Sequence, residues 1–274
     1  MTYFGFLLIF LVMPILIFAG MNWLDSRRGK QLPERLQSWP VWAAITLHIV
    51  IALLYTTLWD NYLVATRVWW YDPELVTGFT IGWVPIEEYT FFILQPILAS
   101  LWMLFLACRI KVVSSAANAP VRLRVWSVGG TAVIWLISVI ILAVSWQPGN
   151  YLALELGWAL PPIALQLAFG ADILWRYRRI VLWTIVPMTL YLATADALAI
   201  GWGTWTINPQ KSLNIFLGGV LPIEEFIFFL LTNILLTFGV VLVLARESHG
   251  RIGDMRQRFT HSGTVANESE MVQR

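Results

Sequence analysis

Residues 221–245 read LPIEEFIFFLLTNILLTFGVVLVLA, and residues 84–108 read VPIEEYTFFILQPILASLWMLFLAC. Either stretch is long and apolar enough to cross the hydrocarbon core of a bilayer, which takes about 20 helical residues. Both begin with a proline, an isoleucine and two adjacent glutamates after one aliphatic residue, and aromatic residues follow. Because carboxyl groups are costly to bury in apolar segments, a pair that occurs twice indicates a chemical role.

The rest of the chain has the composition of a membrane protein with several spans. Of its 274 residues, 58% are hydrophobic and only 12% are charged, which is far from the balance of a soluble domain. We predict an all-α integral membrane protein with seven transmembrane helices, at residues 2–22, 40–59, 84–108, 125–146, 151–174, 180–200 and 221–245. The first stretch lacks a basic leader and a small-residue cleavage pattern, so we expect a span rather than a removable signal.

Basic residues fall in alternate connections between these stretches. They are Arg27, Arg28, Lys30 and Arg35; Arg109, Lys111, Arg122 and Arg124; Arg176, Arg178 and Arg179; and Arg246 and Arg251. The positive-inside rule makes these connections cytoplasmic, which puts the N-terminus outside the cell membrane and the C-terminus in the cytoplasm. Because topology accounts for the arginines, the net charge of +2 indicates no nucleic acid or other anionic partner.

A second pattern precedes both glutamate motifs at identical spacing. It consists of Asp60, Trp69 and Pro73, and again of Asp196, Trp205 and Pro209. Weaker echoes pair Tyr3, Pro14 and Asp25 with Tyr151, Pro162 and Asp172. Helices 1–3 are therefore predicted to be duplicated as helices 5–7, with helix 4 as the connector. An advance of four spans restores the chain direction, so the two triplets should be parallel repeats.

The predicted division of the chain follows from this duplication. The first repeat takes residues 1–112, the connecting helix 113–148, the second repeat 149–247 and a disordered cytoplasmic tail 248–274. The sequence leaves the oligomeric state open, and a homo-oligomer is one of the states that it allows.

The acids are predicted to gather at the non-cytoplasmic ends of the helices. Pro85 and Pro222 suit a first helical turn, where the dipole favours the negative charge of the following glutamates. The candidate catalytic residues are Glu87, Glu88, Glu224, Glu225, Asp60 and Asp196, with Glu155 nearby. Desolvation and like charge oppose the dipole, so which carboxyl is the acid and which the base stays open. Helix capping and interfacial hydrogen bonding are the structural alternative.

Aromatic residues share a helix face with the second glutamate of each motif, because positions three, four and seven residues later lie on the same side. Aromatic faces stabilise a cation that develops beside them. The predicted substrate-binding residues are Trp69, Trp83, Phe91, Phe92, Gln95, Trp202, Trp205, Phe228 and Phe229. A membrane-interface aromatic belt accounts equally well for the tryptophans. His48 is expected to make an interhelical hydrogen bond rather than to act as a base.

These residues resemble the membrane-integral carotenoid cyclases, the lycopene cyclase type that occurs as two small bacterial subunits, as a fused chain and as a domain of fungal bifunctional enzymes. The resemblance rests on both Pro-Ile-Glu-Glu motifs with their Phe-Phe pairs, on Gln95 and on the aspartate-to-tryptophan spacing. It covers nearly the whole chain except the tail and implies the fused form. Thr232 stands at the position that matches Gln95, which suggests that the two halves are used differently.

The resemblance implies an isomerisation that closes the ψ ends of lycopene into β-ionone rings, giving β-carotene. A carboxylic acid protonates C2, the C5=C6 bond attacks the cation at C1, and a carboxylate removes the C6 proton. Aromatic walls exclude water, and the substrate is taken from the lipid bilayer between helices. No G-x-G-x-x-G motif occurs, so no FAD is expected. Three histidines and one cysteine argue against a metal site.

Other classes of membrane protein share some of these sequence features. A retinal protein needs a lysine in the last helix, whereas Lys30, Lys111 and Lys211 all lie in loops. A membrane polyprenyl transferase needs D-x-x-x-D motifs at helix ends, which are absent. A C50 carotenoid cyclase, an ε- or γ-ring cyclase and an end-group hydratase remain as alternatives within carotenoid chemistry. A proton-coupled transporter is the alternative from another class.

Overall fold

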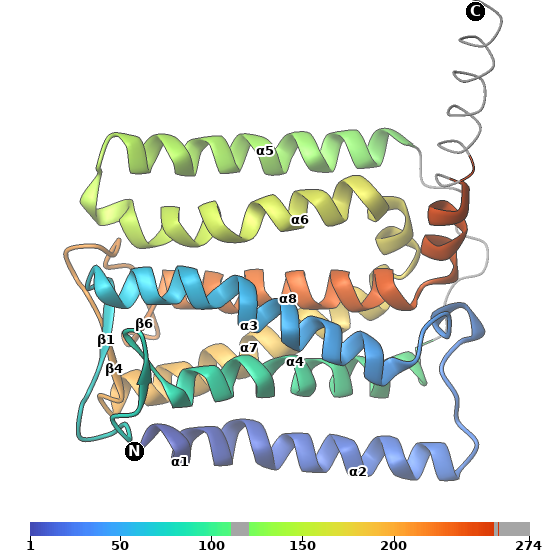
Figure 1. Ribbon diagram of the computed structural model, residues 1–274, viewed down its shortest axis with the longest axis horizontal. Helices are drawn as coiled ribbons and strands as arrows, with labels where there is room; N and C mark the ends of the chain where they lie inside the picture. Colours follow the sequence, from blue (N-terminus) through green and yellow to red (C-terminus); the bar gives the residue numbers. More distant parts are fainter. Residues whose placement is uncertain (111–120, 255–256, 258–274) are drawn as a thin grey trace, which may run out of the picture.

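The computed structural model describes residues 1–110, 121–254 and 257. In this part of the chain, seven helical segments are long and apolar enough to cross a membrane, which confirms the seven predicted stretches. Figure 1 shows them side by side. They are α1 (Tyr3–Leu7), η1 (Leu8–Val12) and α2 (Met13–Arg27) in one rod; α3 (Val41–Ala65); α4 (Ile86–Ala107); α5 (Val121–Ala143); α6 (Asn150–Arg176); α7 (Arg178–Gly201); and α8 (Ile223–Leu244).

Three of these helices form the centre of the bundle. More than half of the apolar window of α4, α7 and α8 is buried, whereas only 11% of that of α5 is buried. α5 packs on α6 at the edge of the molecule (Figure 1). Its outward residues are large and apolar, with Val125, Trp126 and Val133 more than half exposed. Such a surface suits a lipid environment.

Short strands occupy the connections at one end of the bundle, a feature that the prediction of an all-helical protein missed. β2 (Thr80–Ile81) pairs with β3 (Val84–Pro85) and leads into α4, and β5 (Phe216–Leu217) pairs with β6 (Leu221–Pro222) and leads into α8. Gly82 turns the first hairpin with a φ of 69°. A Cβ there would stand 2.1 Å from Asn61 Oδ1, so a larger residue would have to displace the Asn61 side chain as well as adopt a positive φ.

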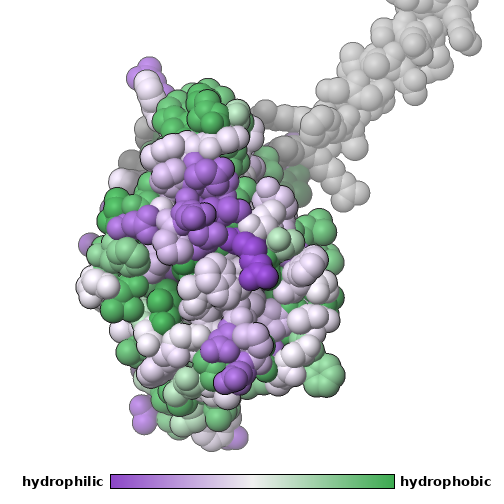
Figure 2. Space-filling model, turned by 90° about the vertical axis from the view of Figure 1, so that its left-hand side faces the viewer, coloured by the Kyte–Doolittle hydropathy of each residue, from purple (hydrophilic) through white to green (hydrophobic). Residues whose placement is uncertain are grey.

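A third strand pair links the two predicted repeats directly. β1 (Trp69–Tyr71) runs antiparallel to β4 (Trp205–Ile207), with Tyr71 opposite Trp205 and Trp69 opposite Ile207. Figure 2 looks onto this loop end of the bundle and shows hydrophilic residues over the middle of the face, with hydrophobic residues around its outline. The strand pair therefore brings Trp69 of the first predicted repeat and Trp205 of the second close together above the helices.

Ion pairs gather at the opposite end of the bundle. Asp25 contacts Lys30 at 3.0 Å and Arg109 at 2.5 Å, and Asp172 contacts Arg251 at 2.5 Å. Residues 248–254, which the sequence places in a disordered tail, are helical here. The rest of that predicted tail lies outside the described residues, apart from residue 257. The arginine-rich connections thus meet at the end away from the glutamate motifs.

Candidate active site

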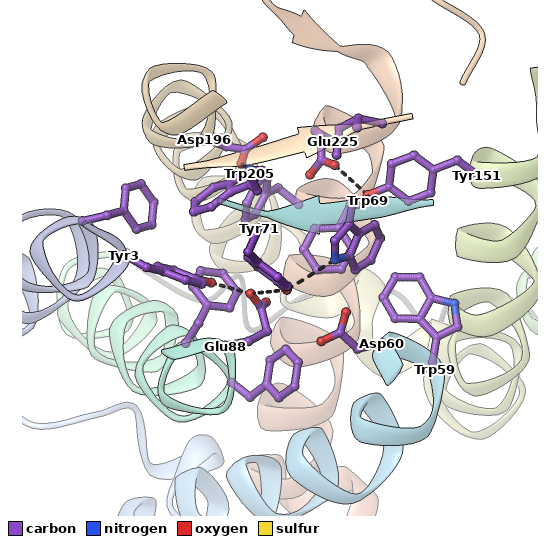
Figure 3. A pocket seen from close by; sticks show the side chains of 16 residues that line it. Tyr3, Trp59, Asp60, Trp69, Tyr71, Glu88, Tyr151, Asp196, Trp205 and Glu225 are labelled. Atoms are coloured by element: carbon purple, nitrogen blue, oxygen red, sulfur yellow. Dashed lines mark hydrogen bonds between the residues drawn. The ribbon is translucent and has the colours of Figure 1, made fainter. Parts of the chain in front are cut away.

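One cavity collects acids from both predicted repeats (Figure 3). Its volume is about 50 Å³. Four carboxyl groups and twelve other side chains line it, namely Asp60, Glu88, Asp196 and Glu225 with Tyr3, Phe6, Trp59, Trp69, Tyr71, Phe91, Phe92, Tyr151, Trp205, Ile207, Phe228 and Phe229. All but one of the twelve are aromatic, so the acids face rings rather than open solvent.

Glu88 is held by two tyrosine hydroxyls. Tyr3 donates to Glu88 Oε2 at 2.5 Å, and Tyr71 donates to the same oxygen at 3.0 Å (Figure 3). The Tyr71 hydroxyl also accepts a hydrogen bond from Trp69 Nε1 at 3.3 Å. Hydrogen bonds donated to a carboxylate stabilise its negative charge. Glu88 is therefore the best prepared of these acids to carry a charge.

Tyr71 belongs to the loop above the helices, and its ionisation matters for this contact. Burial raises the pKa of the Tyr71 phenol well above its ordinary value, and the carboxyl groups of Asp60 and Glu88 raise it further. The hydroxyl therefore keeps its proton and stays a donor to Glu88.

In the second half of the chain, single donors reach the matching acids. Tyr151 donates to Glu225 Oε1 at 2.7 Å. Trp205 Nε1 donates to Asp196 Oδ1 at 2.9 Å. The tyrosine contact repeats that of Tyr3 with Glu88, although no second hydroxyl of the Tyr71 kind reaches Glu225 among the described residues.

Asp60 differs from the other three acids of the cavity. It is only 1% exposed, and neither of its carboxyl oxygens has a hydrogen-bond partner among the described residues. A buried polar group without a partner is costly and calls for an explanation, of which a ligand or a catalytic role is one. Asp60 is thus directed at the cavity with both oxygens free for a ligand.

The first glutamate of each motif has a different position. Glu87 accepts a hydrogen bond from the backbone N–H of Thr77 at 2.6 Å, and Glu224 accepts one from Leu213 at 2.6 Å. Both are fully buried but do not line the cavity. The structure therefore places these two predicted catalytic residues under the loops that cover the site, where they fix the loop backbone.

Six of the nine predicted binding residues line the cavity, namely Trp69, Phe91, Phe92, Trp205, Phe228 and Phe229. Gln95 lines a second cavity, where it donates to Thr232 Oγ1 at 3.0 Å. Trp83 and Trp202 line neither cavity and are 67% and 42% exposed. Trp83 lies in the turn between β2 and β3, where its side chain is exposed.

Sequence reasoning did not assign a role in the site to Tyr3, Tyr71 or Tyr151. Tyr3 and Tyr151 were available as an echo of the duplication, because both stand at matching positions in the first helix of a repeat. Tyr71 carried no such signal, since Ile207 stands at the matching position. His48 was expected to bond between helices, but its Nδ1 contacts Ala44 O of the same helix at 2.7 Å.

In the part of the chain that the structure describes, no group of three or more His, Cys, Asp or Glu side chains is arranged to hold a metal ion. The site instead offers acids and rings. Such a set of groups moves protons and stabilises a cation.

Comparisons with known proteins identify a family for this chain. The family model described as lycopene cyclase matches residues 33–106 and 148–244, so that each matched segment contains one glutamate motif. A lycopene beta-cyclase of Halobacterium salinarum is 39% identical over 209 residues, which cover 74% of this chain and 84% of that protein. A bifunctional lycopene cyclase/phytoene synthase of Podospora anserina is 36% identical over 204 residues, which cover 71% of this chain and 34% of the fungal protein.

No solved structure matches the chain. The family model nevertheless covers more than half of it, and the archaeal relative is similar over most of both proteins. With seven membrane-length helices and a buried cavity of acids and aromatic rings, this membrane protein is a cyclase and belongs to the lycopene cyclase family.

Proposed function

We propose that the protein closes the ψ ends of lycopene into β-ionone rings by acid–base isomerisation, giving β-carotene with no change of oxidation state. The observation that carries this proposal is the presence of four carboxyl groups in one buried, aromatic cavity. The name lycopene beta-cyclase of the archaeal relative favours the β ring over the ε and γ rings.

The proposed reaction begins with proton transfer from Asp60 to C2 of the terminal C1=C2 bond. The resulting tertiary cation at C1 is attacked by the electron pair of C5=C6, which forms the C1–C6 bond and moves the positive charge to C5. Glu88 then takes the proton from C6, which leaves the C5=C6 double bond of the β ring. One proton is added and one is lost, so the product is an isomer of the substrate. The site is reset when Glu88 releases its proton to solvent and Asp60 takes one up from solvent.

The choice of acid and base rests on hydrogen bonding. Glu88 accepts two hydroxyl donors, which suit a negative charge, whereas Asp60 accepts none. Asp60 is therefore assigned the donor role and Glu88 the base role. Asp196 and Glu225 are proposed to influence how many protons the four acids of the cavity carry. The reason is that Coulomb interactions between buried acids are strong.

The rings of the cavity are proposed to protect and stabilise the cation. Trp59 stacks on Phe228 with ring centroids 5.9 Å apart, and Phe228 contacts Phe229 edge to face at 5.2 Å. Aromatic faces attract cations, by about 2 kcal/mol or more where water is excluded. Walls of this kind also oppose the end-group hydratase alternative, because quenching the C1 cation needs a water molecule beside it.

Duplication and topology form part of the same proposal. Equivalent contacts in both halves, Tyr3 with Glu88 and Tyr151 with Glu225, support descent from one three-helix unit. The arginine-rich end of the bundle supports a cytoplasmic C-terminus and an outer position for the cavity. No cofactor is proposed, and lycopene is expected to come from the surrounding lipid.

The test is pigment chromatography after expression in a host that accumulates lycopene. The wild-type chain should produce β-carotene, and Asp60→Asn and Glu88→Gln should each lower the yield by at least about 100-fold, as expected when a general acid or base is removed. Glu34→Gln, at an exposed position remote from the cavity, is the matched control. Normal yields from both cavity variants would refute the acid–base assignment.

Isotope labelling adds a direct check of the first step. In heavy water, one deuterium should appear at C2 of each new ring, because Asp60 exchanges its proton with solvent. A product without deuterium at C2 would exclude protonation by a solvent-exchangeable acid.

A further inference from the structure

A second cavity of about 220 Å³ lies where α3, α4, α6 and α8 meet. Its wall includes His48, Ala52, Gln95, Gln166 and Leu236. Phe92 and Phe228 line this cavity and the acid cavity as well. The two spaces are therefore neighbours on either side of a pair of phenylalanine rings, and the acid cavity is much the smaller.

The size of the acid cavity limits what it can hold. At about 50 Å³, it admits no more than the terminal part of a long ligand. The remainder of a C40 chain must leave past Phe92 and Phe228 or be left in lipid. On α3, Asp60 and His48 are twelve residues apart, so the two cavities together extend about 18 Å along the helix axis.

The wall of the second cavity suits a hydrocarbon. Several of its polar side chains donate their hydrogens to protein oxygens, with Gln95 bonded to Thr232 Oγ1 at 3.0 Å and Gln166 Nε2 bonded to Leu235 O at 2.9 Å. These contacts satisfy the two amide nitrogens, whereas Gln166 Oε1 and Trp158 Nε1 have no hydrogen-bond partner among the described residues and are the polar exceptions in this wall. The remaining lining is largely aliphatic and aromatic.

The cavity also reaches the outer surface of the bundle. Ile51 and Tyr55 line it and are 49% and 42% exposed, on a face of α3 that lies within the apolar span. Tyr55 donates to Trp158 O at 2.8 Å, and its ring stacks on that of Trp158 at 5.7 Å. This pair connects α3 to α6 at the mouth of the cavity, so a lipid-dissolved chain meets it first.

We propose that the second cavity is the binding site of the polyene chain, with the Tyr55–Trp158 pair at its lateral opening to the bilayer. The ψ end passes Phe92 and Phe228 into the acid cavity, while the conjugated chain lies between α3, α4, α6 and α8. This assignment deepens the proposed function and rests on it for the identity of the ligand.

The test fills the cavity without touching the acids. Ala52→Trp places an indole in the polyene site, two helical turns from Asp60. Leu54→Trp is the matched control, because Leu54 is on the same helix, lines neither cavity and is 72% exposed. Conversion of lycopene should fall at least about tenfold with Ala52→Trp, since overpacking blocks the site, and should be unchanged with Leu54→Trp.

A binding measurement separates this inference from the catalytic proposal. Glu88→Gln protein is purified from lycopene-containing membranes, and the lycopene that it retains is measured by absorbance. Retention should persist when Leu54→Trp is added and be lost when Ala52→Trp is added. This readout needs no turnover. If Glu88→Gln still forms rings and the catalytic proposal fails, the total carotenoid that the protein retains is compared in the same way.

Three outcomes would contradict the proposed polyene site, and each has a different meaning. Equal conversion by the two tryptophan variants would overturn the polyene site. Loss of conversion with full lycopene retention would also overturn it, because the indole would then act on the acid cavity alone. If Ala52→Trp lost bound phospholipid but kept lycopene, the cavity would be assigned to a lipid acyl chain, and the polyene site would be overturned. Folding is checked by size-exclusion elution, and Ala52→Phe replaces Ala52→Trp if the larger side chain prevents it.

Discussion

At the scale of single residues, the four acids of the cavity differ in what surrounds them. Glu88 has two hydroxyl donors, Glu225 and Asp196 have one donor apiece, and Asp60 has none. Identical motifs in the sequence therefore give unequal chemical environments. The inequality comes from loop residues, above all Tyr71, and not from the helices that carry the acids.

Tyr71→Phe tests the contribution of this loop residue. Removing one of the two hydroxyl donors to Glu88 should lower the rate of cyclisation about tenfold to hundredfold, because a hydrogen bond to a charged group contributes about 1.5–3 kcal/mol. Initial rates in detergent or liposomes are the measurement. Tyr62→Phe, at a 54% exposed position on α3, should leave the rate unchanged.

The pH dependence of that effect has a definite sign. Since the pKa of Tyr71 is raised far above its ordinary value, the phenol is protonated throughout the neutral and mildly alkaline range. The ratio of wild-type to Tyr71→Phe rates should therefore stay flat between about pH 7 and about pH 9. A ratio that falls as the pH rises across this range would mean that Tyr71 loses its proton there.

The two glutamates of one motif are predicted to respond differently to the same substitution. Glu87→Gln keeps an oxygen that accepts from the Thr77 N–H, so it should retain activity within about tenfold of wild type. Glu88→Gln removes the proposed base and should lose at least about 100-fold. Comparable losses in the two variants, measured on folded protein at equal amounts, would contradict the division of roles described above.

At the scale of elements, the helices followed from the sequence and the strands did not. Seven apolar stretches of bilayer length were sufficient to predict the seven long helices. β1 to β6 are only two or three residues long, too short to show the alternation that identifies a strand. The gathering of four acids was predictable from the repeated motifs, whereas the hydroxyls of Tyr3, Tyr71 and Tyr151 reach them only through the fold.

Trp83 and Gln95 illustrate the limit of arguments from spacing. Trp83 lies two residues before Pro85, close to the acids in sequence, yet its side chain in the β2–β3 turn is exposed. Gln95 lies two turns along α4 from Glu88, and this distance carries it out of the acid cavity into the polyene site. Helical periodicity gave the correct face in this case but not the depth along the helix.

At the scale of the whole molecule, the two halves meet at the acids. β1 of the first half pairs with β4 of the second, and α4 packs against α8 and α7 beneath them. Both halves also contribute acids to one cavity, which neither half could form alone. This arrangement makes the association of the halves a condition for activity.

A divided chain tests that condition. Residues 1–112 and 113–274, produced as separate polypeptides in the same lycopene-accumulating cell, should restore ring formation, and either piece alone should give none. Copurification of the two pieces through a tag on one of them is the accompanying measurement. Activity from a single piece would show that one half contains a complete site.

The pairing of β1 with β4 has a consequence for how this protein tolerates change. Its hydrogen bonds join peptide groups, which every amino acid except proline supplies in full, so other substitutions of the solvent-exposed Thr206 leave the pairing intact. The flanking bonds from Asp72 N to Thr204 O and from Asn208 N to Val68 O show that Trp70 and Thr206 are a hydrogen-bonded pair. A proline at either position removes a peptide N–H from the pairing, and a mutational survey of these two positions should show proline as the least tolerated residue.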